Sequence, residues 1–364
     1  TAYGGDPVRN PDALPTGRNL YGFDPSRVPT RHAWEAGKQA AEKLIAAHRQ
    51  QHGRTPAKLA VSLWSVETMR HQGLLEAQAL WLMGVEPVWD EGGRVIDVKL
   101  VPREQLGRPR VDVVLSATGL YRDHFPNAIR QLARAAQLAA EADREPDNVV
   151  AANTARIRAL LKDRGLDEDS ARDAAQTRIF SSEQGLYGSG LDDAALATDT
   201  WEGKNEGDHK LANLYLSRMQ YAYGPDPRRW GKRLADIMSQ PAGGSAQSAS
   251  GGNAVSASGA SPDGTTANTT ANAPGARGEA LNLYAEQLRG TEGAVLSRSS
   301  NLYGMLTTDD PFQYLGGIGL AVRHLDGKAP ELYISNLRTP GSGRVERASQ
   351  FLSRELATRQ FHPG

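Results

Sequence analysis

The chain has 364 residues, enough for two or three compact units with hydrophobic cores. Its 42 basic and 42 acidic residues cancel, so the sequence lacks the positive charge that is typical of nucleic-acid binders. No apolar run approaches the roughly 20 residues of a transmembrane helix, and zero cysteines exclude disulfides and thiolate metal ligands. Any metal site must therefore use histidine and carboxylate ligands, which suit borderline to hard divalent ions.

The first part of the chain predicts an α/β unit. Residues 1–30, rich in Gly, Pro, Asn and Asp, indicate an ordered connector, and residues 31–145 then alternate between helix and strand patterns. The expected elements are helices at 33–52, 68–83 and 126–142, and strands at 58–64, 86–89, 95–101 and 111–116. This alternation is typical of a parallel Rossmann-like or flavodoxin-like sheet.

The remainder predicts helical additions, an insert and a second α/β piece. Residues 146–239 indicate a helical and loop-rich segment, with helices at 147–177 and 210–223. Gly, Ser, Ala and Asn dominate residues 240–278, and such a segment cannot bury enough apolar area to offset its chain entropy, so we expect a disordered insert. Residues 279–364 indicate a C-terminal α/β piece, with helices at 279–289, 312–324 and 345–358 and a strand at 332–336. Neither end looks capped, so the sequence reads as a truncated part of a longer protein.

A group of ionisable residues follows the strand at 58–64. Glu67 and His71 are four residues apart, which places both on one face of a helix, with Arg70 beside them. Glu76 would share that site only if Gly73 distorts the helix. The pattern fits a site at the carboxyl edge of a parallel sheet, and it equally fits an ordinary helix start with solvated charges.

A second polar group follows the strand at 111–116. Tyr121, Arg122, Asp123 and His124 come soon after Gly119, at what we expect to be another edge of the same crevice. The planar fork of Arg122 suits a ligand carboxylate. The alternative is that Asp123 caps the next helix and that Arg122 pairs inside the protein.

Two loops of Gly, Ser and Tyr form a third candidate region, at 180–190, which includes Tyr187, and at 297–304. Their composition suits stacking on a flat ring. An acidic and aromatic cluster at a helix start adds Asp309, Asp310 and Gln313. No GxxxxGK[ST] phosphate loop occurs, so we do not expect this chain itself to hydrolyse ATP.

Several stretches together resemble the large subunit of ATP-dependent cobaltochelatase, which is related to the porphyrin-binding subunit of magnesium chelatase. The stretches that carry the resemblance are VETMRHQGLLEAQAL (66–80), GVEPVWDEGGRV (84–95), GRPRVDVVLSATGLYRDHFPN (107–127), RIFSSEQGLYGSGL (178–191), SRSSNLYGMLTTDDPFQYLGG (297–317) and ELYISNL (331–337). The opening stretch 4–30 belongs with them, so the likeness covers nearly the whole chain apart from the insert.

The resemblance implies binding of a corrin precursor, hydrogenobyrinic acid a,c-diamide, together with Co²⁺. It also implies that Mg-ATP is hydrolysed by partner subunits, one a AAA+ ATPase and the other its companion. Metal insertion needs groups that remove pyrrole protons and deliver a divalent ion, so it implies catalytic roles for Glu67, His71 and Glu76, with Glu67 and His71 on the metal. The residues expected to bind the tetrapyrrole are Arg70, Tyr121, Arg122, Asp123, His124, Tyr187, Asp309, Asp310 and Gln313.

Two alternatives remain. The first is a magnesium chelatase large subunit acting on protoporphyrin IX. The Leu74 and Glu76 pattern and the ELYISNL stretch argue against it and favour the cobalt branch. The second is a tetrapyrrole-binding module without catalytic activity. With no signal peptide and no disulfides, the sequence fits the cytoplasm.

The composition of residues 240–275 generates a first prediction. Deleting this segment should change the free energy of unfolding by no more than about 1 kcal/mol, because the closure entropy of a loop depends only weakly on its length. Urea unfolding of the deleted and intact chains measures the difference. A deleted chain that fails to fold would contradict the prediction.

Overall fold

The computed structural model describes residues 23–142, 145–197, 202–239, 281–300, 304–338 and 344–361. The insert predicted at 240–278 and most of the connector predicted at 1–30 lie outside the described residues. Within these ranges no helix is both long and apolar enough to span a bilayer.

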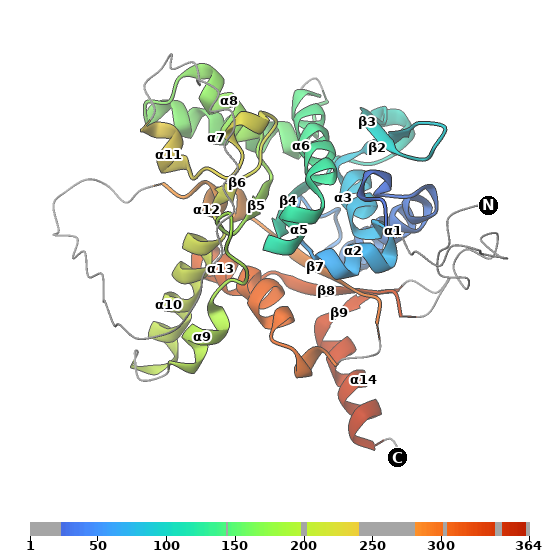
Figure 1. Ribbon diagram of the computed structural model, residues 1–364, viewed down its shortest axis with the longest axis vertical. Helices are drawn as coiled ribbons and strands as arrows, with labels where there is room; N and C mark the ends of the chain where they lie inside the picture. Colours follow the sequence, from blue (N-terminus) through green and yellow to red (C-terminus); the bar gives the residue numbers. More distant parts are fainter. Residues whose placement is uncertain are drawn as a thin grey trace, which may run out of the picture.

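The described residues form one central sheet of seven strands in the order β6-β5-β4-β1-β7-β8-β9 (Figure 1). The five inner strands are parallel, and β6 and β9 pair antiparallel at the two edges. The strands are β1 (Lys58–Leu63), β4 (Asp112–Ala117), β5 (Ile179–Ser181), β6 (Tyr221–Ala222), β7 (Gly293–Arg298), β8 (Glu331–Asn336) and β9 (Arg344–Arg347). The predicted parallel α/β fold is therefore confirmed. The strands from the predicted segments 31–145 and 279–364 lie in the same sheet, since β7 pairs directly with β1.

Helices cover both faces of the sheet. The longer ones are α1 (Arg31–His52), α3 (Leu74–Met83), α6 (Pro126–Glu141), α7 (Val149–Asp163), α8 (Glu168–Gln176), α10 (Gly203–Arg218), α13 (Gly317–Asp326) and α14 (Ala348–Phe361). The shorter helices are α2 (Ser65–His71), α4 (Arg103–Leu106), α5 (Gly119–His124), α9 (Leu191–Leu196), α11 (Leu234–Met238) and α12 (Leu283–Leu288). Single turns occur at η2 (Pro25–Arg27), η4 (Pro227–Arg229), η5 (Met305–Thr307) and η6 (Phe312–Gly316), the last of which is π-helical.

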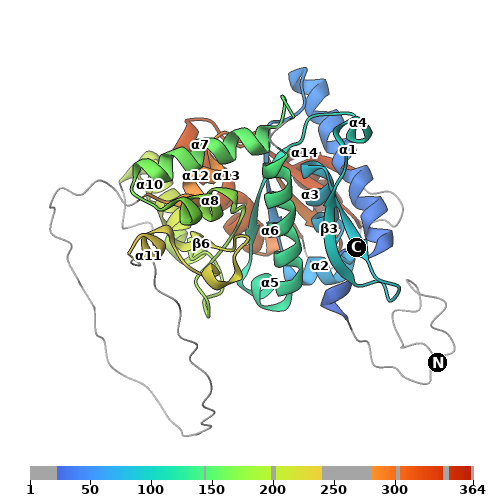
Figure 2. The ribbon, with the colours of Figure 1, turned by 90° about the horizontal axis from the view of Figure 1, so that it is seen from above.

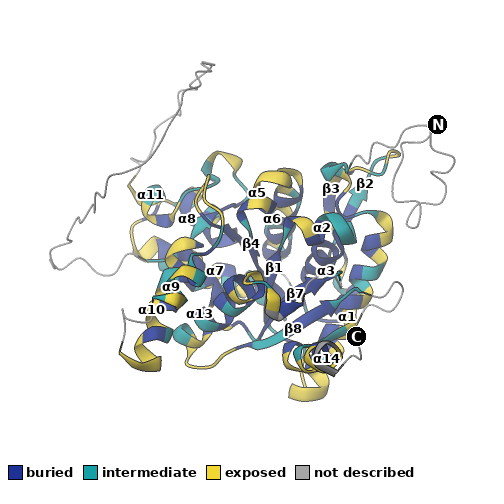
Figure 3. Cartoon of the chain, turned by 60° about the horizontal axis from the view of Figure 1, so that its bottom comes forward, coloured by how far each residue is buried: buried dark blue, intermediate teal, exposed yellow. Residues whose placement is uncertain are grey.

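Alternation along the buried strands separates two hydrophobic cores. Val61 of β1 faces a core formed with α1, α3 and α6, whereas Ala60 faces a core formed with α7, α8, α10, α12 and α13. Figure 2 shows these two groups of helices on opposite sides of the sheet, and Figure 3 shows the central strands as buried. The result is a three-layer arrangement in which β1, β4, β5 and β7 are buried along their whole length.

Several elements differ from the sequence prediction. The strands expected at 86–89 and 95–101 form an antiparallel hairpin, β2 (Val85–Trp89) and β3 (Val95–Leu100), which lies apart from the main sheet. The helix expected at 210–223 ends at Arg218 and is followed by β6, and the helix expected at 345–358 begins only after β9. Strand β7 is absent from the prediction, because a run of four small and apolar residues, GAVL, is too short for periodicity to identify.

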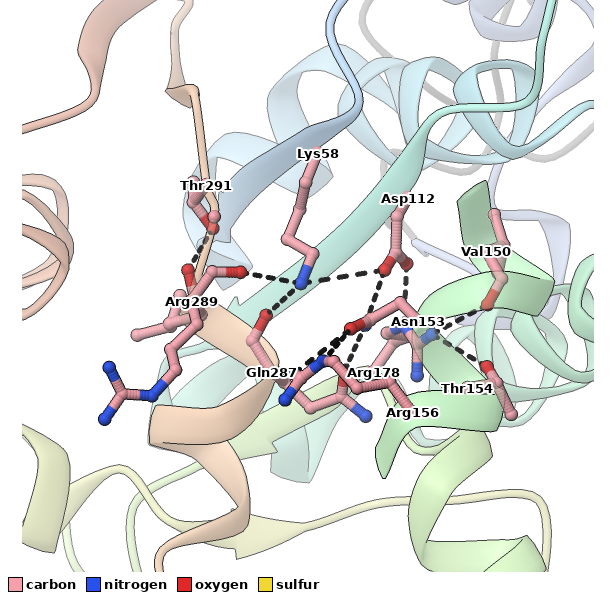
Figure 4. A network of polar contacts seen from close by, with 12 residues as sticks. Lys58, Asp112, Val150, Asn153, Thr154, Arg156, Arg178, Gln287, Arg289 and Thr291 are labelled. Atoms are coloured by element: carbon pink, nitrogen blue, oxygen red, sulfur yellow. Dashed lines mark hydrogen bonds and ion pairs between the residues drawn. The ribbon is translucent and has the colours of Figure 1, made fainter. Parts of the chain in front are cut away.

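A buried polar network fixes the amino ends of the strands (Figure 4). Asp112, the first residue of β4, accepts hydrogen bonds from Arg178 Nε at 2.6 Å and from Asn153 Nδ2 at 2.8 Å. Lys58, the first residue of β1, donates to the carbonyl oxygens of Gln287 and Arg289 at 2.9 and 2.8 Å, and its Nζ lies 3.9 Å from Asp112 Oδ2. Since Lys58 is also the register partner of Asp112, the network ties β1, β4, β5 and α12 together at one edge of the sheet.

The network predicts a pH-dependent stability. Burial lowers the pKa of Lys58 to about 8, despite the attraction of Asp112. Between pH 8 and 10 the unfolded chain therefore keeps a proton that the folded chain has released, so the free energy of unfolding should rise with pH by about 1.4 kcal/mol per unit from this group. Urea unfolding across this range should show the rise in the wild type and its loss in Lys58→Met.

Lys99 is the matched control, because its side chain is 64% exposed in a surface ion pair with Glu86. Lys99→Met should keep the wild-type slope of stability against pH. Equal slopes in the wild type and Lys58→Met would contradict the assignment.

Candidate functional site

The helix that follows β1 is broken, and the break builds the site. The sequence predicts a single helix at 68–83, but α2 ends at His71 and α3 begins at Leu74. Between them, Gln72 and Gly73 adopt left-handed conformations with φ of 55° and 88°. The distortion at Gly73, which is the condition for Glu76 to join the site, is therefore observed.

Helix α2 is attached to the end of β7 by two side chains. Glu67 Oε2 accepts a hydrogen bond from the backbone N–H of Ser299 at 2.7 Å, and His71 Nε2 lies 3.1 Å from Ser297 Oγ. Residues four apart on a helix are separated by about 6 Å along its axis, and alternate residues of a strand by a similar distance. The spacing of Glu67 and His71 therefore matches that of the two serines, and we call these contacts the double hook.

The hydrogen bonds of His71 define the tautomer of its neutral ring. Its Nδ1 accepts from the backbone N–H of Leu74 at 3.0 Å, at the start of α3. Because Nδ1 must be unprotonated to accept, the proton of the neutral ring is on Nε2 and points toward Ser297.

Glu76 lies beneath the break, with 1% of its surface exposed. Thr68 Oγ1 donates to its Oε1 at 2.7 Å, and Tyr121 from the neighbouring helix α5 faces the same carboxyl group. Burial raises the pKa of Glu76, and burial together with the charge of Glu76 raises the pKa of Tyr121. The buried carboxyl group therefore holds a proton more strongly than an exposed glutamate does.

Arg122 is engaged within the protein. Its guanidinium pairs with Asp123 at 2.8 Å and donates from Nη1 to the carbonyl oxygens of Ser182 and Glu183 at 2.9 and 2.8 Å. Tyr187 donates from its hydroxyl to Asp123 at 2.8 Å, and the bond from Arg122 lowers the pKa of Asp123. This internal pairing is the alternative that the sequence leaves open for Arg122. The cap that the same alternative expects from Asp123 is not observed, because the N-cap residue of α6 is Phe125. A role for Arg122 on a ligand carboxylate stays a prediction.

His124 is exposed and is held by a residue at the start of α2. Ser65, 3% exposed in the first turn of α2, lies with its Oγ 2.7 Å from His124 Nδ1. This contact joins α2 and α5, so the side chains that follow β1 and β4 meet, as predicted for the two edges of one crevice.

The third group of predicted residues reaches the same edge through the loop after β5. Gln313 accepts from the backbone N–H of Ser189 at 2.9 Å and donates to Asp309 at 2.6 Å. Asp309 and Asp310 are exposed. Tyr314, next to Gln313, packs edge-to-face on Trp64 with ring centroids 6.0 Å apart. Gln313 therefore holds the loop in place, whereas the two aspartates are the solvent-facing members of the group.

The site also has an exposed apolar rim. Large apolar side chains are exposed on the segments that follow the carboxyl ends of β1, β4 and β5 and on η6: Val66, Leu120, Leu186, Tyr187 and Phe312. A rim of this kind can cover the face of a flat, apolar ligand.

The described residues contain no group of three or more histidine or acidic side chains arranged to hold a metal ion. The metal role of Glu67 and His71 thus stays a prediction. Thr68, which holds Glu76, is a site residue that the sequence patterns do not single out. Ser297 and Ser299 belong to the candidate loop predicted at 297–304, but their contacts with His71 and Glu67 are not predicted. A strand prediction at 293–298 would have pointed to these contacts, since Ser297 lies near the end of β7, beside β1.

The chain is similar to known proteins over its whole length. Residues 1–364 match the family model described as CobN/Magnesium Chelatase. The chain is 31% identical over 361 residues to the aerobic cobaltochelatase subunit CobN of a Sinorhizobium species, and 31% identical over 362 residues to the H subunit of magnesium chelatase from Cereibacter sphaeroides. Each alignment covers 99% of this chain, but only 24% and 25% of the two relatives.

A solved structure shares the fold. The catalytic subunit of cobaltochelatase from Mycobacterium tuberculosis aligns with a TM-score of 0.72 and 32% identity, over 97% of this chain and 25% of that one. The chain therefore spans about a quarter of the length of the proteins it matches.

The break between α2 and α3 generates a prediction about Gly73. A Cβ atom there would lie 2.6 Å from Val28 Cγ1 and 2.7 Å from Pro29 Cα, in addition to the strain of a φ of +88°. Gly73→Ala should therefore lower the free energy of unfolding by roughly 3 kcal/mol. The control is Gly53→Ala, because Gly53 has a φ of +73° with nothing within 4 Å of the added atom. It should cost only about 1 kcal/mol, and equal losses in the two variants by chemical denaturation would contradict the role given to close packing at the break.

Proposed function

Because the chain belongs to the CobN/magnesium chelatase family, we propose that it is the tetrapyrrole- and metal-binding part of a cobaltochelatase large subunit. Its substrates are then hydrogenobyrinic acid a,c-diamide and Co²⁺. ATP is hydrolysed by a AAA+ partner subunit and its companion, in the cytoplasm. Metal chelation is the activity named for both groups of relatives.

The observation that carries the proposal is the position of the double hook. Strand β1 is followed by α3 on one face of the sheet, whereas β7 is followed by α13 on the opposite face. The strand order therefore reverses between these two neighbouring parallel strands. Ligands of open α/β sheets bind at the carboxyl edge at such a reversal. The buried carboxyl groups of Glu67 and Glu76 and the exposed apolar rim both lie at this edge, which suits a ring with apolar faces and polar central nitrogens.

The proposed chemistry assigns proton transfer to the buried side of the site. Insertion of a divalent ion requires N–H protons of the ring to leave. His71 and Glu76 are the proton-accepting groups in this proposal, and Glu67 and Ser297 hold His71 and α2 in place. Deprotonated Glu76 can accept a pyrrole proton readily, since burial raises its pKa.

A magnesium chelatase acting on protoporphyrin IX is the second candidate. The identity to the H subunit of magnesium chelatase from Cereibacter sphaeroides equals that to the CobN subunit, at 31%. The cobaltochelatase structure, at 32% identity over 97% of this chain, supports the first candidate.

The choice of ring is tested by binding. The chain should shift the absorption spectrum of hydrogenobyrinic acid a,c-diamide and bind it with a lower Kd than protoporphyrin IX, as measured by quenching of tryptophan fluorescence. The opposite order of affinities would favour the magnesium activity. No binding of either ring would overturn the proposal.

The roles of His71 and Glu76 are tested by insertion of Co²⁺ in the presence of cobaltochelatase partner subunits and ATP. His71→Ala and Glu76→Gln should each lower the insertion rate by roughly 100-fold, the usual loss for a general acid or base, while the Kd for the ring stays near the wild-type value. Gln keeps the shape of a protonated Glu76, so the fold should tolerate it. His32, exposed on α1, is the matched control, and His32→Ala should insert at the wild-type rate. Variants that lose ring binding and thermal stability together would make both residues structural.

A further inference from the structure

Two histidines meet on the surface, away from the carboxyl edge of the sheet. His209 of α10 and His324 of α13 lie with their Nδ1 atoms 2.8 Å apart and their ring centroids 4.9 Å apart. His324 is in the last turn of α13, whereas the residues of the proposed tetrapyrrole site lie before the start of that helix. His209 is exposed and His324 is half-buried, so solvent reaches the pair.

The Nδ1 atoms cannot both carry a proton, nor can both present a lone pair to the other. At 2.8 Å one ring donates to the other, so a single proton lies between the two nitrogens. A divalent metal ion can take the place of this proton, since metal–nitrogen bonds are about 2.0–2.1 Å long. Two such ligands of a tetrahedral ion lie about 3.3 Å apart, which requires the rings to separate by only about half an ångström.

The two helices hold the rings in this arrangement. Gly317 of α13 packs against the ring of Tyr215 from α10 so closely that a Cβ atom would lie 2.4 Å from it. Tyr215 itself is fully buried, so the helices cannot separate freely. Both imidazoles are therefore presented by rigid, packed elements, which reduces the ordering cost of binding an ion.

The surroundings of the pair disfavour protonation of His324. Burial, the neighbouring His209 and Arg289 lower the pKa of His324. Asp208, next to His209, is bound by Lys204 Nζ at 2.7 Å and lies 3.5 Å from Arg323 Nη1. Since this carboxylate is already paired with cations, we expect water molecules to complete the coordination of a metal ion bound by the two histidines.

We propose that His209 and His324 form a two-histidine site for a divalent transition-metal ion of the Cu²⁺, Ni²⁺ or Zn²⁺ class, bridging α10 and α13. Imidazole nitrogens bind these borderline ions in preference to Mg²⁺ or Ca²⁺. The site is independent of the proposed insertion chemistry. It also affects how metal stoichiometry is measured, because Co²⁺ added to this chain would divide between the substrate site and the histidine pair.

The test uses the full chain with Cu²⁺ and Ni²⁺ alone, without tetrapyrrole. One equivalent of Cu²⁺ should bind with an electron paramagnetic resonance spectrum of two nitrogen ligands, and Ni²⁺ should raise the Tm. His209→Gln and His324→Gln should each weaken binding by roughly tenfold or more and abolish the rise in Tm. Binding should also be lost at pH 5, where protons compete for both rings.

Two controls make the outcome decisive. His32→Gln, which changes an isolated exposed histidine, should bind like the wild type. His48 and His52 of α1 are a second neighbouring pair, with ring centroids 4.4 Å apart. The proposal is overturned if the double variant of His209 and His324 binds as tightly as the wild type, if His48→Gln abolishes binding instead, or if the wild type binds nothing up to about 1 mM metal.

Discussion

The buried charge network at the amino ends of the strands is the constraint on which the rest of the structure depends. Asp112, 1% exposed, would be costly to bury without the hydrogen bonds from Arg178 and Asn153. Those bonds can form only when Lys58 and Asp112 are in register and β5 enters beside them. A slip of one residue would turn the inward side chains to the opposite face and separate the charges. The network therefore fixes where β1, β4 and β5 begin.

The register at the amino ends of the strands also determines where their carboxyl ends lie. Because β1 and β4 are equally long and paired from their first residues, Leu63 lies opposite Ala117, and the segments that follow leave the sheet at the same level. Strand β7 lies on the other side of β1, so its final residues reach the start of α2. The double hook of Glu67 and His71 is thus a consequence of the register that is set at the opposite edge of the sheet.

The sequence predicts the parts of this architecture that depend on long periodic patterns. The strands at Lys58 and Asp112 and the helices at Arg31 and Pro126 are identifiable because apolar residues recur over a full element. Strand β7 is as long as β1 and β4, but its apolar run, Ala294 to Leu296, is too short to give such a signal. The sequence therefore places Ser297 and Ser299 in a candidate loop and not as partners of His71 and Glu67. Arg122 shows a different limit: its residue type suits a ligand carboxylate and an internal ion pair equally, and only the three-dimensional position of Asp123 distinguishes them. Composition and spacing therefore point to the candidate site, but they do not define the contacts of its side chains.

The contacts of His71 connect the proposed chemistry to the fold. Both ring nitrogens are engaged, Nδ1 by the backbone of Leu74 and Nε2 by Ser297. Each nitrogen offers only one position in the plane of the ring, so His71 cannot bind a metal ion or a pyrrole proton through Nε2 while it donates to Ser297. Nε2 can accept a metal ion or a pyrrole proton only after its own proton has moved to Nδ1, which breaks the contacts with both Ser297 and Leu74 and leaves Glu67 as the remaining attachment of α2 to β7. In the proposed chemistry, use of His71 is therefore coupled to the position of α2, because the same imidazole cannot serve the ligand and these contacts at once.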